Sequence, residues 1–149
     1  MTDKPATSDE HMRLDDFLCF AVYSTNHAFN RIYKPLLDAL DLTYPQYLTM
    51  VALWQKDDQT VGSLGEKLFL ESSTLTPLLK RLEAMGHLRR IRDARDERQV
   101  RIQLTEAGRA LEEKAKSVPR CILEATGLTE ETLQTLKNEL AKVRNAMLR

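Results

Sequence analysis

The sequence predicts a mainly α-helical fold with one small β-hairpin. Apolar residues recur at spacings of three and four along most of the 149-residue chain, which is the period of amphipathic helices. The period changes to two at Val100, Ile102 and Leu104. Polar residues separate these three positions, as in a strand with one buried face. A chain of this length is expected to form a single domain with a hydrophobic core.

Residues 60–85 are predicted to form two helices joined by a short turn. The first helix begins after Thr60, and the second extends from about Ser73 to Met85. Gly86 follows the second helix, at the position where glycine commonly ends one. Leucines line one face of this second helix, and we expect that face to be buried. The other face carries polar residues, namely Ser73, Thr74, Thr76, Lys80 and Arg81.

The hairpin follows directly, with strands predicted at residues 87–92 and 100–104 and a charged loop between them. Two helices followed by such a hairpin form a winged helix-turn-helix. Its second helix lies in the major groove of DNA, and its wing reaches towards the minor groove. Between Lys80 and Arg101, basic residues outnumber acidic ones by four, whereas the whole chain has a formal net charge of zero. This local positive charge favours a phosphate-binding surface over a hairpin that is merely solvated.

A helical pattern precedes this unit over residues 12–40, where Pro35 is expected to kink or divide the helix. Thr43, Pro45 and Gln46 then fit the N-cap, the first turn and the reciprocal position of a capping box. A further helix is therefore expected to begin here and to lead into the winged unit.

Two more helical segments follow the wing. Residues 106 to about 125 are predicted to form one long helix that Pro119 bends. Gly127 ends this helix, and Thr129 caps a last helix that carries an apolar stripe.

The apolar faces of the terminal helices predict a homodimer. One winged domain cannot bury both the face of residues 12–40 and that of residues 105–149, so we expect these regions to pack against a second chain. Residues 43–104 would then form the DNA-binding part. Two recognition helices about 34 Å apart would meet successive major grooves of a palindromic site. The alternative is a monomer that folds its own helices into a bundle.

Composition and residue spacing argue against a membrane protein, a secreted protein and a metalloprotein. No apolar run approaches the roughly 18 residues of a membrane span, so no membrane partner is expected. Residues 1–11 are polar, predict a disordered tail and lack the apolar core of a signal peptide, which makes the cytoplasm the default location. Two cysteines do not form a structural disulfide framework. The three histidines and two cysteines lack the spacing of a metal site, and no cofactor is predicted.

Three motifs are specific enough to indicate a family: LTYPQYLTMVALW, LESSTLTPLLKRLE and DARDERQVRIQLTEAG. Over nearly its full length the chain resembles repressors of the MarR family. Two further pieces, LDDFLCFAVYS and YKPLLDALDLTYPQY, most resemble the branch that senses organic hydroperoxides, usually called OhrR. The resemblance implies a transcriptional repressor, not an enzyme.

The resemblance also implies a redox site. Cys19 would be the sensing thiol, and Tyr33 and Tyr44 of the partner subunit would hydrogen-bond its sulfur. Tyr23 lies one helical turn after Cys19 on the same face. Phenol O–H donors favour the thiolate, which is the form that attacks a peroxide. Cys121 would form a disulfide with the oxidised Cys19 across the dimer. If Cys121 is incidental, a small thiol would cap Cys19 instead.

For DNA, we expect the start of the second helix to meet phosphates and base edges. The residues expected there are Ser72, Ser73, Thr74 and Thr76, with Lys80 and Arg81 on phosphates. The resemblance places Arg98 in the minor groove, steadied by Asp96, and Arg95 is a second candidate at the wing tip.

These residues together predict a homodimer that binds a palindromic promoter when reduced. It would release the DNA when an organic hydroperoxide oxidises Cys19. One alternative is a MarR-type regulator that a phenolic or lipophilic ligand releases, with incidental cysteines. Another is a thiol peroxidase, although the chain has no CxxC or peroxidase signature.

Overall fold

The computed structural model describes residues 11–149, so nearly all of the predicted disordered tail lies outside the described residues. The fold is mostly helical with one three-stranded antiparallel sheet, and the predicted fold class is confirmed. The elements are a 3-10 turn η1 (Leu14–Asp16), α1 (Leu18–Asp38), α2 (Tyr44–Gln55), β1 (Gln59–Thr60), α3 (Val61–Leu68), α4 (Ser72–Ala84), β2 (Leu88–Arg92), β3 (Val100–Leu104), α5 (Glu106–Ala115), α6 (Val118–Thr126) and α7 (Glu130–Met147).

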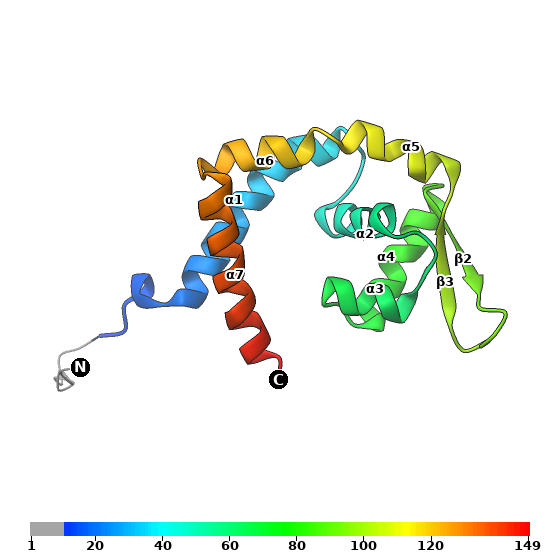
Figure 1. The fold of residues 1–149 in the computed structure, drawn as a ribbon, viewed down its shortest axis with the longest axis horizontal. Coiled ribbons are helices and arrows are strands. Elements are labelled where there is room, and N and C mark those ends of the chain that lie inside the picture. Colours follow the sequence, from blue (N-terminus) through cyan, green and yellow to red (C-terminus); the bar gives the residue numbers. More distant parts are fainter. Residues whose placement is uncertain (1–10) are drawn as a thin grey trace.

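The elements fall into two groups that α5 connects (Figure 1). Helices α2, α3 and α4 pack with the sheet as a winged unit, and α1, α6 and α7 gather at the other end of the molecule. The strands β2 and β3 project from the winged unit as a hairpin. Among the described residues, no helix has both the length and the apolar character that crossing a membrane requires.

The core lies where the helices of the winged unit meet the sheet. Leu64 of α3 is fully buried there, as are Met50 and Leu53 of α2. The periodicity also correctly predicts the buried leucines of α4: Leu75, Leu79 and Leu82. Ile102 and Leu104 of β3 are buried, whereas Gln103 between them is only half-buried. The alternation therefore puts one face of the hairpin on the core and leaves the other face towards solvent.

The predicted start of α2 is confirmed in detail. The backbone N–H of Thr43 donates to Oε1 of Gln46 at 2.9 Å, and the N–H of Gln46 donates to Oγ1 of Thr43 at 3.4 Å. Pro45 lies in the first turn, where a helix leaves its N–H groups without intrahelical acceptors. This reciprocal cap fixes the entry of the chain into the winged unit.

The terminal helices differ from the expectations in three places. Pro35 was expected to kink or divide its helix, and it does not divide α1: it lies in the last turn, where only one intrahelical bond is lost. The segment before Leu18 is a separate 3-10 turn and not part of the helix. The single long helix predicted after the wing is two helices: α5 ends at Ala115 and α6 begins at Val118. Pro119 has no N–H for the carbonyl of Ala115, so it breaks the helix and does not merely bend it.

The strand β1 was not predicted. It pairs with β3 so that Gln59 faces Ile102, while β2 pairs with the other edge of β3. The Gln59 side chain is buried and donates from Nε2 to the carbonyl of Ala52 at 3.1 Å. Its Oε1 accepts from Oγ of Ser63 at 3.0 Å and from Nζ of Lys67 at 2.8 Å. A buried polar side chain with partners on two helices leaves no periodic pattern in the sequence.

Candidate nucleic-acid interface and thiol site

The recognition helix α4 begins one residue earlier than predicted, with Glu71 as its N-cap. Leu75, Leu79 and Leu82 anchor one face in the core. The expected DNA contacts near the helix start lie on the opposite side: Ser72, Ser73 and Thr74 are exposed, and Thr76 is half-buried.

The N-terminus of α4 differs from those of its neighbours. Threonine side chains cap α2, α3, α5 and α7 by accepting a backbone N–H three residues on. No side chain caps α4, and the N–H groups of Ser72 and Ser73 have no acceptor among residues 11–149. These donors and the positive end of the helix dipole form a place where a phosphate oxygen can bind.

Lys80 and Arg81 extend the exposed side of α4. Within the described part of the chain, neither forms an ion pair. Their charges are therefore available to phosphates.

The tip of the wing brings Arg98 and Asp96 together. Nε of Arg98 lies 3.1 Å from Oδ1 of Asp96, and the side chain of Arg98 is 90% exposed. Arg95 is exposed as well, and its backbone N–H donates to Oδ1 of Asp93 at 2.7 Å. The carboxylate of Asp93 thus shapes the turn, while the two arginine side chains extend into solvent.

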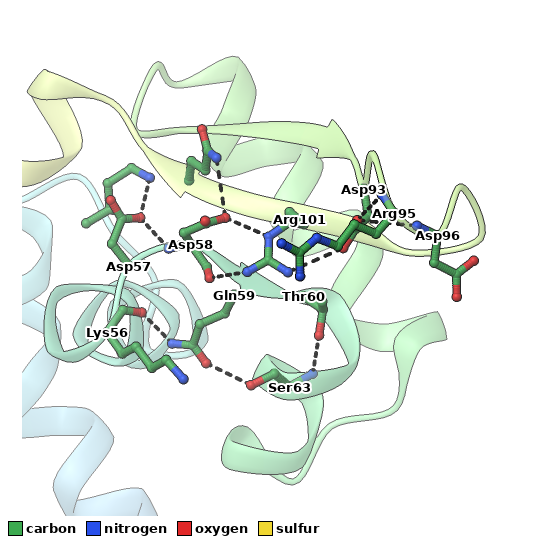
Figure 2. Close-up of polar contacts among 12 residues, drawn as sticks. Lys56, Asp57, Asp58, Gln59, Thr60, Ser63, Asp93, Arg95, Asp96 and Arg101 are labelled. Atoms are coloured by element: carbon green, nitrogen blue, oxygen red, sulfur yellow. Dashed lines mark hydrogen bonds and ion pairs between the residues drawn. The ribbon is translucent and has the colours of Figure 1, made fainter.

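Arg101 holds the base of the wing to the loop before β1 (Figure 2). Its Nε donates to Oδ1 of Asp58 at 2.8 Å, its Nη2 donates to the Asp58 carbonyl at 2.7 Å, and its Nη1 donates to Oδ2 of Asp93 at 3.3 Å. The bond from Arg101 lowers the pKa of Asp58, and the N–H of Arg95 contributes most to lowering the pKa of Asp93. Arg101 belongs to the basic segment of the sequence, but its guanidinium is occupied.

The neighbouring Asp57 joins the same loop to β3 and α5. Its Oδ1 accepts the backbone N–H of Leu104 at 2.8 Å, and its Oδ2 lies 2.7 Å from Nη2 of Arg109. Burial alone would raise the pKa of Asp57, but these hydrogen bonds outweigh it and lower the pKa. Asp58 has a φ of 55°, a left-handed conformation that aspartate adopts more readily than most residues. The pair Asp57–Asp58 was the only sequence signal for this junction.

An ion pair between Glu83 and Arg90 connects α4 to the wing. Glu83 accepts the backbone N–H of Arg90 at 2.8 Å and its Nε at 3.2 Å. The backbone hydrogen bond is the main cause that lowers the pKa of Glu83. Arg90, like Arg101, is therefore part of the scaffold that fixes the recognition helix relative to the hairpin.

Cys19 lies in a groove between α1 and α7 with a volume of about 800 Å³. Its side chain is exposed and not buried as a small apolar core residue. The groove walls are mainly apolar and include Leu140 and Met147, and two cations, Lys137 and Arg144, line the same groove. A thiol here is open to a small apolar oxidant.

The predicted tyrosine partners lie far from Cys19 within one chain. Tyr33 is 14 residues further along the same helix, or about 21 Å along its axis. Its ring lies 4.7 Å from that of Tyr44 and 5.9 Å from that of Tyr47, between centroids. Burial raises the pKa of all three phenols, so they remain hydrogen-bond donors at neutral pH. Tyr23 packs edge-on against His27, with 4.4 Å between the ring centroids.

The two cysteines are also apart in a single chain. Cys121 is half-buried on α6, and its neighbour Ile122 lines a cavity with Phe29 of α1. Phe29 lies about 15 Å along α1 from Cys19. A disulfide needs Cα atoms about 4.4–6.8 Å apart, so one chain in this conformation cannot close it. Both thiols are free.

Within residues 11–149, no group of three or more histidine, cysteine or acidic residues could hold a metal ion.

Residues 31–115 match the family described as transcriptional regulator SarA/Rot. The chain is 49% identical to the HTH-type transcriptional regulator TtmR of Methylorubrum extorquens, over 93% of this chain and 71% of that one. It is 47% identical to the organic hydroperoxide resistance transcriptional regulator of Bacillus subtilis, over 88% of this chain and 89% of that one. The chain belongs to the SarA/Rot family of MarR-like winged-helix transcriptional regulators. The predicted family is thereby confirmed.

Solved structures of AbfR from Staphylococcus epidermidis have the same fold as this regulator. The reduced, DNA-bound AbfR has a TM-score of 0.78 and 35% identity, over 93% of this chain and 96% of that one. The disulfide form of AbfR has a TM-score of 0.63 and 36% identity, over 92% and 93% of the two chains. By TM-score, the chain is therefore more similar to the reduced, DNA-bound AbfR than to its disulfide form.

Proposed function

We propose that this regulator is a peroxide-sensing transcriptional repressor that acts as a homodimer. The reduced dimer binds a palindromic promoter site, and oxidation of Cys19 by an organic hydroperoxide releases it. The main support is the position of Cys19, exposed in an apolar groove, in a chain that is 47% identical to a regulator named for organic hydroperoxide resistance.

The dimer rests on apolar residues that one chain leaves uncovered. The exposed ones on η1, α1 and α7 include Leu14, Phe17, Leu18, Val22, Leu136, Leu140, Val143 and Met147. Exposed apolar residues gathered on one surface are uncommon on a monomeric protein and mark a contact with another surface. A second copy of α1 and α7 supplies a matching apolar surface, as a two-fold interface requires.

A dimer also completes the thiol site. Tyr33 and Tyr44 cannot reach Cys19 of their own chain, because α1 holds them about 21 Å away. In the dimer they would approach Cys19 of the partner subunit and donate hydrogen bonds to its thiolate. Charge-assisted bonds of this kind are stronger than neutral ones and favour the reactive form of the sulfur.

The chemistry has two balanced steps. The Cys19 thiolate attacks an oxygen of the hydroperoxide, so an S–O bond forms and the O–O bond breaks. The sulfur loses two electrons, the peroxide gains them, and the alkoxide leaves as an alcohol after taking up a proton. The thiolate of Cys121 of the partner subunit then attacks the sulfenic acid. An S–S bond forms, and hydroxide leaves as water after protonation.

The disulfide would end DNA binding by moving helices. The proposed disulfide would bring the Cα atoms of Cys19 and of Cys121 of the partner subunit to about 4.4–6.8 Å from each other, and we expect this to shift α1 or α6. The recognition helices and wings would then no longer match the spacing of successive major grooves. All the DNA contacts would then be lost together: those of the α4 start, of Lys80 and Arg81, and of the wing residues Arg95 and Arg98. Affinity depends steeply on the number of phosphates that the protein neutralises.

The test uses a fluorescent DNA fragment selected from a random pool by its binding to the reduced protein. Fluorescence anisotropy is measured before and after one equivalent of cumene hydroperoxide, and a non-reducing gel is run in parallel. We expect release of the DNA together with a disulfide-linked dimer. Cys19→Ser should bind the same DNA and stay bound after peroxide. Release of that variant by peroxide would exclude Cys19 as the sensor.

A second candidate function has one observation in its favour. A cavity of about 240 Å³ between α1, α6 and α7 is lined by apolar side chains that include Phe29, Ile32 and Leu136. A small lipophilic or phenolic ligand bound there could shift the same helices. In that case simple phenols would release the Cys19→Ser variant from DNA.

A thiol peroxidase would instead consume many equivalents of hydroperoxide per chain in the presence of a thiol reductant, whereas a sensor consumes about one.

A further inference from the structure

One side chain lies both in the Cys19 groove and against the helix-turn-helix. Arg144 of α7 lines the groove that contains Cys19. The Cζ atom of Arg144 also lies 4.5 Å from the centroid of the Phe69 ring, which is a cation–π contact. Figure 1 shows how this occurs: α7 turns back from α6, and its C-terminal end reaches towards α3.

Phe69 occupies the turn that leads into the recognition helix. It is the C-cap of α3, with its N–H bonded to the carbonyl of Gly65, and lies two residues before Glu71, the N-cap of α4. The turn is tight, because a Cβ atom on Gly65 would lie 2.8 Å from the carbonyl oxygen of Leu70. Because the turn packs closely on α3 and only Leu70 separates Phe69 from the N-cap of α4, a displacement of the Phe69 backbone is expected to move the start of α4.

The backbone of Phe69 indicates that its side chain has a purpose other than forming the turn. Its φ of 57° is a left-handed conformation that glycine and asparagine adopt easily and an aromatic residue adopts with strain. Phe69 is 57% exposed, so it does not serve the core of the winged unit. Within residues 11–149, the Arg144 guanidinium lies over its ring.

Arg144 is free to respond to the groove. Its Nε donates to Oδ1 of Asn145 at 3.3 Å, and among residues 11–149 it has no carboxylate partner. Lys137 lines the same groove but has no ion pair or aromatic contact within the described residues. Only one of the two groove cations is therefore connected to the DNA-binding unit.

We propose that Arg144 is a positioning residue that couples the state of Cys19 to the recognition helix through its contact with Phe69. This inference rests on the proposed redox function. In the reduced protein the contact holds the turn before α4 in its DNA-binding position. When Cys19 leaves the groove to form its disulfide, the groove between α1 and α7 rearranges, Arg144 moves away from Phe69, and the turn is released.

The test measures the dissociation constant for DNA of the reduced and the peroxide-treated protein. A partly exposed cation–π contact corresponds to about a two- to fivefold change per subunit, or roughly five- to thirtyfold for a dimer. Arg144→Gln should weaken DNA binding of the reduced protein by up to this factor and leave the oxidised protein unchanged. The ratio of the dissociation constant of the oxidised protein to that of the reduced protein therefore falls. Arg144→Lys keeps a cation over the ring and should restore most of the ratio, whereas Lys137→Gln should behave like the wild type.

Phe69→Asn separates coupling from folding. Asparagine suits the left-handed backbone, so thermal stability should not fall, yet removal of the ring should lower the ratio as Arg144→Gln does. The double variant should be no worse than either single variant, because both remove the same contact. Additive losses, or an unchanged ratio in Arg144→Gln, would overturn the coupling. If the wild type itself ignores peroxide, the proposed redox function fails, which is a distinct outcome.

Discussion

Gly108 offers a quantitative test of how the wing is fixed to the C-terminal helices. A Cβ atom at this position would lie 2.0 Å from the carbonyl oxygen of His87 and 2.9 Å from its carbonyl carbon. Both are backbone atoms, so α5 must move away from the wing by about an ångström to accept alanine. That movement strains two hydrogen bonds: Thr105 N–H to the His87 carbonyl (3.1 Å) and Trp54 Nε1 to the Gly108 carbonyl (2.8 Å).

The expected loss for Gly108→Ala follows from these contacts. Overpacking costs about 1–3 kcal/mol, and each weakened hydrogen bond costs about 1 kcal/mol. Replacing a helical glycine by alanine returns up to about 1 kcal/mol. The net loss in the free energy of unfolding is about 2–4 kcal/mol, which corresponds to a melting temperature lower by about 5–15 °C. This is a large part of the stability of a small domain.

Gly62→Ala is the matched control. Gly62 lies in the first turn of α3, where the nearest atom to a Cβ would be Oγ1 of Thr60 at 3.9 Å, an ordinary contact. The same substitution should therefore leave stability unchanged or raise it by up to about 1 kcal/mol. Circular dichroism followed during urea and thermal unfolding measures both variants. A Gly108→Ala protein as stable as the wild type would refute the close packing of α5 against the residue that begins the wing.

Three further outcomes are expected. Arg98→Ala should bind DNA more weakly and keep the wild-type melting temperature. The plot of log affinity against log salt concentration should be shallower by about one unit of slope for each phosphate that is no longer neutralised. An affinity equal to that of the wild type would remove Arg98 from the interface. Cys121→Ser should show no linked dimer on a non-reducing gel and should release DNA reversibly only with an added small thiol, whereas wild-type behaviour would make Cys121 incidental. Hydrogen bonds lower the pKa of Asp57 below its ordinary value of 3.8, so the stability that its carboxylate contributes is present above that pH and is lost as the pH falls towards the lowered value. Asp57→Asn should therefore flatten the fall of melting temperature below about pH 4; an unaltered acid limb would contradict this role.

The family resemblance and the local structure could be predicted from the sequence because both depend on residues close together in the chain. The capping box at Thr43 and Gln46 needs only four residues, and the helices and the hairpin follow from the spacing of apolar side chains. The change of period at Val100 placed β3 correctly at Val100–Leu104. The exposed face of α4 could be predicted for the same reason, since it is the complement of a periodic buried face; that this face contacts DNA stays a prediction.

The tertiary structure alone decided which charges and thiols have partners. Arg101 is as basic as Arg98 in the sequence, but its pairing with Asp58 depends on β1, a strand of two residues that has no periodic signal. The contact between Arg144 and Phe69 joins segments 75 residues apart. Nor does the sequence show that a continuous α1 keeps Cys19 away from the tyrosines of its own chain. The physical reason is common to all three: an ion pair, a stacked cation or a thiolate hydrogen bond exists only within a few ångströms, and only the packing of distant segments sets that distance.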